Sequence, residues 1–595
     1  MREFSTPAAD STDRWTPLAA DPHLWAARAP HHTLLSRHLA GRWEPVSAAA
    51  FADHVRAVAK GLIASGIRPG DRVGLWSSTR YDWSVLDYAL WAAGAVSVPL
   101  YETAQPAEVA WILADSGAVA LIAEHPSWAV RLAEEERPDG VVRHWFLDDP
   151  SGSALDLLTG TGKHLPDAAI SDRLATIEPG DAATDIYTSG TTGRPKSCQL
   201  THGNVTAAVT AALSGESELF DAPEPATLLF LPLAHIFARL IQWSAVRAGV
   251  RLGHSNEIGG LSAQLRDFDP TFVLGVPRIF ERAYNTASQV AVADGKGSRF
   301  DRATTVAIRY SRALDAGRVP LPLRAEHAVY ERTVFPEIRA AFGERCRFAI
   351  SGGAPLGDRL AHFYRGAGLP VLEGYGLSEG GGALTANSPS SHKVGTVGRP
   401  LPGVGVRVAD NGELLFSGQS VFSGYAHNDA DQAVRGGWLH TGDCGEVDEE
   451  GFVRITGRLE ELLVAAGGKR VSPTHLEERL RVHPLIAQAL VVGDGRPFVG
   501  ALLSLDPEEY TAWAATHDPS PTYPQAGHDL RLLAELQRAV DAANLGVSEA
   551  ESIRRFSVVA TAWSEEGGEL TPSLKLRRSV VLRAHRDDVE GLYFR

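Results

Sequence analysis

Hydrophobic positions in the first third of the chain change repeatedly between helix-like and strand-like spacing. Apolar residues recur at helical spacing from Phe51 until Gly66, which predicts a helix. A Pro-Gly-Asp turn then leads into a short apolar run over 72–76, and a helical pattern over 83–93 and a strand pattern over 95–99 follow. Alternation of this kind predicts a parallel, doubly wound sheet with helices on both faces.

The same pattern predicts further elements and two segments of different character. Apolar runs of strand length lie at 118–123, 227–231, 271–275 and 348–351. Residues 1–45 are rich in Pro and Ala with poor periodicity, so we expect a loosely ordered lead segment. Residues 284–341 are Arg-rich with helical spacing, and Pro320 and Pro322 indicate a loop within them. We expect a covering insertion with solvated charges and no catalytic residue.

The character of the chain changes again after residue 393. Proline, glycine and alternating valines between 393 and 458 predict hairpins or a distorted β-barrel. Beyond Leu459 the chain predicts a small unit with an amphipathic helix and a hairpin that turns at Gly493-Asp494-Gly495. We therefore expect an α/β protein with a large domain over 1–459, made of doubly wound sheets plus a distorted β-barrel, and a small α+β domain over 460–595.

Composition and charge limit the class of protein. The chain has 595 residues, of which 44% are hydrophobic and 22% charged, as is ordinary for a globular enzyme. A net charge of −15 argues against nucleic-acid binding and against electrostatic docking to an anionic membrane. Three scattered cysteines indicate a reducing compartment and no zinc site. With no apolar signal core at the N-terminus, and with 88–100 too short to span a bilayer, we expect a cytoplasmic protein.

The stretch DIYTSGTTGRPKSCQLTHGN, residues 185–204, has the composition of a phosphate-binding loop. Glycines at two positions allow positive φ and close backbone approach, so that successive N–H groups can line a concave anion site. Hydroxyls add donors and a lysine adds a compact positive charge. The residues concerned are Thr188, Ser189, Gly190, Thr191, Thr192, Gly193 and Lys196.

This loop is not the P-loop of kinases and GTPases, because only two residues separate Gly190 from Gly193. The plain alternative is a polar glycine-rich turn. Lysine is rare in this chain, which has seven lysines among 57 basic residues, so that Lys196 carries information.

Later segments carry further candidate binding residues. SGGAPL follows a predicted strand, and its paired glycines would let a flat base approach the backbone, although a plain turn looks the same. EGYGLSEGGG offers an aromatic face for stacking and hard oxygens for Mg²⁺. An aspartate could accept both ribose hydroxyls and an arginine could hold phosphate, with a salt bridge as the alternative for each. These candidates are Gly352, Gly353, Ala354, Gly374, Tyr375, Gly376, Ser378, Glu379, Asp443 and Arg458.

In their order and spacing these motifs resemble the adenylate-forming superfamily of acyl-CoA synthetases, luciferases and peptide-synthetase adenylation domains. The resemblance extends from about Gly70 to Arg578 and is nearest to bacterial long-chain fatty acyl-CoA synthetases, whose FLPLAH and VPRIFERAYN segments this chain shares. It implies ATP, Mg²⁺ and CoA as ligands and an acyl-adenylate as intermediate. It also implies that the small C-terminal domain is mobile.

The resemblance implies a role for each motif. The loop from Thr188 to Lys196 would hold the β- and γ-phosphates, with Mg²⁺ on Glu379 and Thr188. Tyr375 and the Gly352-Gly353 turn would flank adenine and Asp443 would hold the ribose. Lys575 would bridge the substrate carboxylate and the α-phosphate, and His235 would line the acyl pocket, although a core histidine is an equal alternative. The hinge would be Glu460, and Gly467, Gly468 and Lys469 would form the pantetheine tunnel.

Some positions depart from the family pattern. Glu460 stands where Asp or Lys is usual, Ser378 replaces Thr and Ser197 replaces Gly. The triplet 380–382 is all glycine where long-chain relatives have bulkier residues, so we expect an enlarged or reshaped acyl pocket.

Other functions remain open on the sequence. An amide-forming ligase, a fatty acyl-AMP ligase that loads a carrier protein, and a nitrite-activating diazotase all keep adenylation and change the acid or the acceptor. The chain could also be a catalytically silent binding protein, but the presence of Lys575, Glu379 and Asp443 argues against this alternative. The sequence leaves oligomeric state, chain-length preference and peripheral membrane contact undecided.

Overall fold

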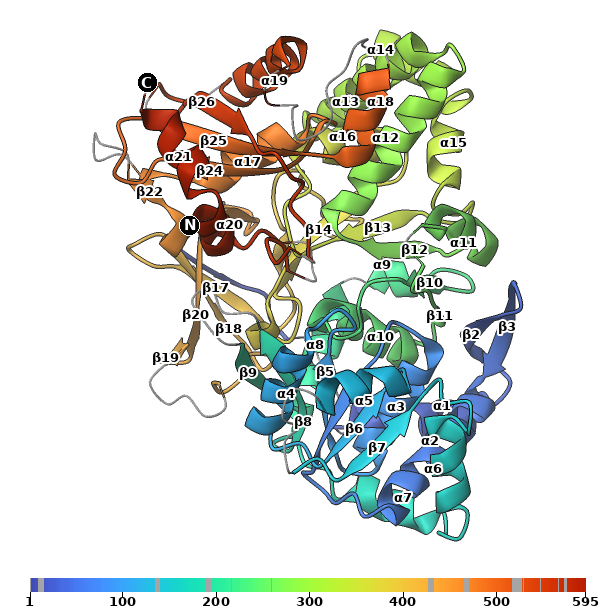
Figure 1. Cartoon of the computed structure of the whole chain (residues 1–595). Helices are drawn as coiled ribbons and strands as arrows, with labels where there is room; N and C mark the ends of the chain where they lie inside the picture. Colours follow the sequence, from blue (N-terminus) through green and yellow to red (C-terminus); the bar gives the residue numbers. More distant parts are fainter. Residues whose placement is uncertain are drawn as a thin grey trace.

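The computed structural model describes residues 2–8, 15–133, 140–188, 195–215, 217–257, 259–425, 433–464, 470–515, 527, 529–545, 547–549, 551–565, 567–571 and 575–594. Figure 1 shows the orange and red C-terminal part at the upper left, beside the green helices of the large part, whose blue elements lie below. Among the described residues, no helix combines the length and the apolar character needed to cross a membrane.

The first sheet is the doubly wound sheet that the alternating pattern predicts. Its strand order is β7-β6-β4-β5-β8-β9, and only β9 is antiparallel to its neighbour. The strands are β4 (Arg72–Trp76), β5 (Val96–Leu100), β6 (Ala120–Ala123), β7 (Arg143–Phe146), β8 (Ala182–Thr188) and β9 (Lys196–Thr201). Its helices are α2 (Ala48–Ala64), α3 (Tyr81–Ala92), α4 (Pro106–Asp115), α5 (Pro126–Ala133), α6 (Ala154–Gly162), α7 (Ala168–Ala175) and α8 (His202–Gly215).

Two further sheets continue the large domain. One has the order β10-β11-β2-β3 and the other the order β12-β13-β14-β15-β16. Their strands are β2 (Thr33–Leu39), β3 (Arg42–Ser47), β10 (Ala226–Leu229), β11 (Arg251–His254), β12 (Phe272–Gly275), β13 (Phe348–Ser351), β14 (Val371–Tyr375), β15 (Thr385–Ala386) and β16 (Arg399–Pro400). Associated helices are α1 (Asp21–Arg28), α9 (Ser217–Phe220), α10 (Ile236–Ala248), α11 (Leu261–Phe268), α16 (Asp358–Gly366) and the short helices η1 (Leu18–Ala20) and η2 (Ser378–Gly380).

The expected loose lead segment is wrong, because most of residues 1–45 belongs to the folded domain. The segment contributes β1 (Glu3–Ser5), α1, β2 and most of β3. Asp21 is buried and accepts a 2.7 Å hydrogen bond from Arg247 of α10, and Trp25 donates to the Arg247 carbonyl. These contacts join residues that are more than two hundred positions apart. The local spacing of hydrophobic residues carries no information about such contacts.

The Arg-rich insertion is helical, as expected. It forms α12 (Pro277–Ala293), α13 (Gly297–Asp315), α14 (Leu321–Glu331) and α15 (Phe335–Ala340). Its prolines do not both mark a loop: Pro320 is the N-cap of α14 and Pro322 lies in its first turn. Proline is tolerated there because first-turn N–H groups have no partner within the helix.

The β-rich region is a six-stranded sheet in the order β1-β17-β18-β20-β19, with β21 also paired to β20. Its strands are β17 (Gly405–Val408), β18 (Glu413–Ser417), β19 (Val434–Arg435), β20 (Trp438–Val447) and β21 (Val453–Arg458). Pairing among the described residues does not close this sheet into the expected barrel. The extreme N-terminus joins it through β1, which pairs with β17.

The C-terminal part is α+β. The predicted hairpin is present as β24 and β25, with β26 parallel to β25. The elements are η3 (Leu459–Glu461), β22 (Leu463–Val464), β23 (Arg470–Val471), α17 (Pro473–Arg481), β24 (Ile486–Val492), β25 (Val499–Leu505), α18 (Pro507–Ala515), α19 (Leu530–Ala543), β26 (Ile553–Val558), α20 (Arg578–Ala584) and α21 (Arg586–Tyr593). The hydrophobic clusters of this part contain only residues from Leu463 onward. The clusters of the large domain contain no residue beyond Ile455, so the two parts have separate cores.

A buried polar network holds α10 in place above the first sheet. Arg239 of α10 is fully buried and forms an ion pair with Asp87 of α3. Its guanidinium also donates to Thr184 Oγ1 of β8 at 2.7 Å. Because a buried charge must be paired, this network connects α10 to the strand that ends at Thr188.

Candidate active site

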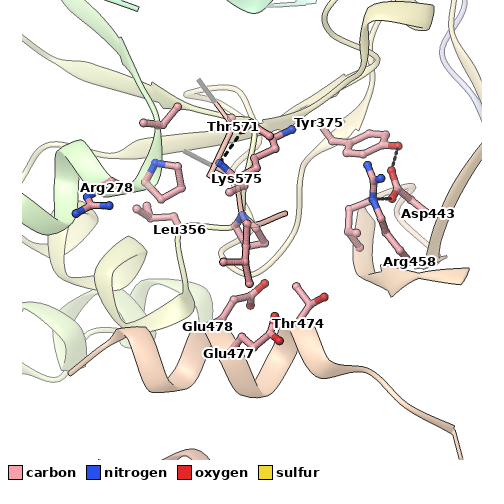
Figure 2. Close-up of a pocket in the computed structure, with 18 of the residues that line it drawn as sticks. Arg278, Leu356, Tyr375, Asp443, Arg458, Thr474, Glu477, Glu478, Thr571 and Lys575 are labelled. Atoms are coloured by element: carbon pink, nitrogen blue, oxygen red, sulfur yellow. Dashed lines mark hydrogen bonds and ion pairs between the residues drawn. The ribbon is translucent and has the colours of Figure 1, made fainter. Parts of the chain in front are cut away.

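A cavity of about 3260 Å³ lies between the large and the small domain and is lined by residues of both. Figure 2 shows α17 along its lower side in this view, with Tyr375 and Asp443 on the right. Lysines, arginines and carboxylates line it together with apolar residues of α9 and α10 and the residue after β10. These apolar residues include Leu219, Phe220, Phe230, Leu240 and Ile241.

The two ends of the phosphate-loop candidate lie side by side at this cavity. Thr188 ends β8 and pairs in antiparallel register with Lys196, the first residue of β9, and both line the cavity. The stretch between them therefore joins two neighbouring strands and does not lead from a strand into a helix as a P-loop does. Ser189, Gly190, Thr191, Thr192 and Gly193 lie outside the described residues, and their anion site stays a prediction.

Lys196 is connected to Glu379 through a residue that the sequence analysis missed. Its ammonium lies 5.2 Å from the ring centroid of Tyr425, a cation–π contact. The Tyr425 hydroxyl donates a 2.6 Å hydrogen bond to Glu379 Oε1, and the Tyr425 backbone pairs with Cys198 of β9. Glu379 is buried in η2 beside β9. The only sequence signal was an aromatic at the end of SVFSGY, where nothing local indicates a partner in η2.

Tyr375, Asp443 and Arg458 form one connected group. The Tyr375 hydroxyl donates to Asp443 Oδ2 at 2.5 Å, and Arg458 Nε lies 3.0 Å from Asp443 Oδ1. Asp443 and Arg458 face each other across β20 and β21, and Tyr375 is the last residue of β14. Burial, with the Asp443 charge second, raises the pKa of the Tyr375 hydroxyl well above its usual value. The salt-bridge alternative for Asp443 and Arg458 is therefore realised, at the wall of the cavity.

The glycines of the site are required by close packing. A Cβ on Gly352 would lie 2.8 Å from the Phe237 ring, and one on Gly376 would lie 2.2 Å from the Gly382 carbonyl oxygen. Gly353 has φ +81°, where side chains are strained. Gly352, Gly353, Ala354, Gly374, Gly376 and Ser378 all line the cavity.

The side chain of His235 is only partly buried, so it is not a core histidine, and its place in an acyl pocket stays a prediction. His235 is the N-cap of α10, where its Nδ1 accepts a 3.2 Å hydrogen bond from the Phe237 N–H, and it also lines the cavity. Burial, and then the nearby charge of Lys575, lower the pKa of His235 to about 4. The imidazole is therefore neutral above about pH 5.

Lys575 lies in the same cavity and is held by pairing between residues 570–571 and 575–576, which we call the lysine hairpin. Leu570 pairs with Leu576, the Thr571 N–H donates to the Lys575 carbonyl at 2.8 Å, and the Lys575 N–H donates to Thr571 Oγ1 at 3.0 Å. Figure 2 shows its side chain extending toward Tyr375. Lys575 is exposed to solvent where it lines the cavity. Burial, and then the charge of Arg458, lower the pKa of Lys575, while Asp443 and Glu379 oppose this change.

The expected effect of the glycine triplet is largely wrong. Gly380 and Gly381 are buried, and a Cβ at either position would lie within about 3 Å of Leu384 or Ala208. The space beside them is filled by neighbouring side chains, so their lack of side chains does not enlarge the cavity. Only Gly382 of the three lines it, with Ile236 3.1 Å from its Cβ position.

Two remaining predictions concern the small domain. Glu460, the predicted hinge, lies in η3 and lines the cavity. Gly467, Gly468 and Lys469 lie outside the described residues, so their place in a pantetheine tunnel stays a prediction.

Family models match nearly the whole chain. Residues 23–426 match the AMP-binding enzyme model, and residues 460–595 match the AMP-binding enzyme C-terminal domain model. The chain therefore belongs to the AMP-binding enzyme family. It is 46% identical over 598 residues to long-chain-fatty-acid–CoA ligase FadD15 of Mycobacterium tuberculosis and of Mycobacterium bovis, with 100% of each chain covered. The solved adenylation domain of a Mycobacterium chelonae carboxylate reductase matches at TM-score 0.73 and 21% identity, covering 98% of this chain and 92% of that one.

These comparisons confirm the predicted superfamily, its two-part α/β fold and the predicted enzyme class, an AMP-forming acid–thiol ligase. The roles of individual residues and the boundary at 459 and 460 are not tested by them and stay predictions.

Proposed function

We propose that this protein activates a long-chain fatty acid as its acyl-adenylate and transfers the acyl group to CoA, giving acyl-CoA, AMP and pyrophosphate. The observation that carries this proposal is the convergence of Lys575, Glu379 and Asp443 on one cavity with both ends of the phosphate loop. The apolar residues of α9 and α10 that line the cavity support a long hydrocarbon chain as the acyl group.

The chemistry explains why these groups are needed. A carboxylate is a poor acylating agent because oxide would have to leave. In the first half-reaction a carboxylate oxygen attacks the α-phosphorus of ATP, a new P–O bond forms, and the bond to pyrophosphate breaks. Such a transfer depends mainly on positioning and on charge neutralisation.

The phosphate end of the nucleotide is assigned to the region around β8 and β9. The loop 188–196 would hold the β- and γ-phosphates, with the Lys196 ammonium kept in place by the Tyr425 ring. Glu379 and Thr188 supply a carboxylate and a hydroxyl, the hard oxygen donors that Mg²⁺ prefers, and would hold it there. When bound, Mg²⁺ supplies positive charge that neutralises the phosphates.

The nucleoside end is assigned to β14 and β20. The Tyr375 ring and the Gly352-Gly353 turn would flank adenine, and Ala354, Gly374, Gly376 and Ser378 would complete that wall. Asp443 would accept the ribose hydroxyls, oriented by its bonds to Tyr375 and Arg458. Arg458 would also help to hold phosphate.

Lys575 is the proposed catalytic cation. Its ammonium is the compact, flexible charge that can bridge the substrate carboxylate and the α-phosphate. His235, which is neutral, would line the acyl pocket.

In the second half-reaction the thiol of CoA attacks the acyl carbon, a C–S bond forms and AMP leaves. We assign the boundary to 459 and 460 and the hinge to Glu460, so that a swing of the small domain would withdraw Lys575 and bring Gly467, Gly468 and Lys469 to the site. We also propose a cytoplasmic location.

The test is to incubate the protein with ATP, Mg²⁺ and single acids of varied chain length and to measure pyrophosphate and AMP with and without CoA. Long-chain acids should cause release of pyrophosphate from ATP, and addition of CoA should convert the acyl-adenylate to the thioester with release of AMP. Acyl-AMP that CoA does not consume would indicate another acceptor, and no AMP with any acid would refute adenylation.

A further inference from the structure

Arg578, the first residue of α20, forms a buried ion pair three positions after Lys575. Its Nη1 donates to Glu477 Oε1 of α17 at 2.5 Å and its Nη2 donates to the Val491 carbonyl of β24 at 2.7 Å. Glu477 Oε1 also accepts from the Val491 N–H at 2.7 Å. The side chains of Arg578 and Glu477 are only 15% and 11% exposed. Arg578 is thus bound to two elements of the small domain at once.

The backbone between this pair and Lys575 is also held in place. The Arg577 N–H donates to the Glu569 carbonyl at 2.7 Å, and Leu570 pairs with Leu576. Val581, one turn into α20, is fully buried against β24 and β25. The ion pair of Arg578 with Glu477 therefore lies directly after the C-terminal end of the lysine hairpin and connects it to α17.

The charge of Arg578 also acts on the segment that joins the two domains. Burial raises the pKa of Glu461, which lies in η3 next to Glu460, and the charges of Arg578 and then Arg458 oppose that rise. The ion-pair partner of Arg578 is Glu477 of α17.

We propose that Arg578, paired with Glu477, is a positioning residue for Lys575: it makes the lysine hairpin rigid with α17, so that the ammonium moves with the small domain as a unit. This inference rests on the proposed function. It predicts that loss of the pair impairs adenylation, which needs Lys575 in place, and spares thioester formation, which does not.

The test combines R578M with E477Q, so that no buried carboxylate is left without a partner. Adenylation is measured by exchange of pyrophosphate into ATP, and thioester formation by adding CoA to supplied acyl-AMP. A displaced catalytic group can cost about 100-fold, so kcat for adenylation should fall by about 10- to 100-fold with little change in the KM for ATP. R578K should restore part of the rate because it keeps the charge.

The matched control is R554M, which breaks the Arg554–Glu549 pair of the same domain at residues that do not line the cavity, and it should leave both half-reactions within about twofold. The decisive comparison is in the K575A background, where R578M/E477Q should cause no further loss of adenylation. An equal loss with and without Lys575, or an equal loss in both half-reactions, would overturn the positioning role. A wild-type protein without adenylation would instead refute the proposed function, and this role with it.

Discussion

Gln289 of α12 donates a 2.8 Å hydrogen bond to Glu509 of α18, which joins the helical insertion to the small domain. On the same helix Arg278 lies 3.7 Å from Asp506 and Arg282 lies 3.6 Å from Glu508. Figure 1 shows α18 alongside α12. The insertion therefore carries positive charge toward a negative segment of the small domain, in the arrangement that places Lys575 in the cavity.

The first prediction concerns these contacts between domains. R282E should slow adenylation by a few fold, because exposed pairs contribute about 0.2–1 kcal/mol each, and the effect should shrink in high salt. Adding E508R should restore the rate by reversing both charges. R309E, which breaks the Arg309–Glu326 pair within the insertion, is the control. If the reversed pair failed to restore the rate, the prediction would be wrong.

The second prediction is a loss of adenylation at alkaline pH. The pKa of Lys575 lies below its usual 10.5, mainly because of burial. Since the proposed role needs the charged form, the rate should fall as pH rises through this lowered pKa. K575R, which stays charged, should be slower but should lack this alkaline decline. The measurement is the pH profile of pyrophosphate exchange, and an identical decline in K575R would assign it to another group.

The third prediction concerns stability. Burial raises the pKa of Glu373 from 4.5 to about 7, although its carboxylate accepts the Leu356 N–H at 2.9 Å. Between these pH values the folded protein binds more protons than the unfolded chain, so stability falls as pH rises, by roughly 3 kcal/mol. E373Q keeps the acceptor and removes the charge. It should raise the melting temperature at pH 8 and change it little at pH 4.5, and a gain that does not depend on pH would contradict this cause.

The fourth prediction separates the two roles of His235. Asparagine is a good N-cap, so H235N should keep α10 stable, whereas H235A should cost about 1 kcal/mol through loss of the cap. Neither variant changes the charge of the cavity wall, because the histidine is already neutral. If His235 only caps and lines, H235N should alter the KM for the acid and leave the kcat of adenylation nearly unchanged. A large loss of kcat in H235N would show a direct part in the reaction.

Much of this protein follows from local pattern. Alternating helix and strand spacing predicted the first sheet and placed β4 and β13 at their observed bounds, because apolar periodicity reports burial of one local face. The motifs around Tyr375, Asp443 and Lys575 were recognisable because each needs particular residue types over a short stretch. The family resemblance rested on their order along the chain.

Other features depend on partners far away in sequence. The fold of residues 1–45 comes from contacts such as Asp21 with Arg247, and the link from Lys196 to Glu379 passes through Tyr425. Gly380 and Gly381 do not widen the cavity because Leu384 and Ala208 fill the space beside them. The sequence by itself therefore determined the elements, the family and the chemistry of the candidate groups. Only the tertiary structure decided which of those groups meet and what occupies the space between them, because packing and buried hydrogen bonds join residues that are hundreds of positions apart.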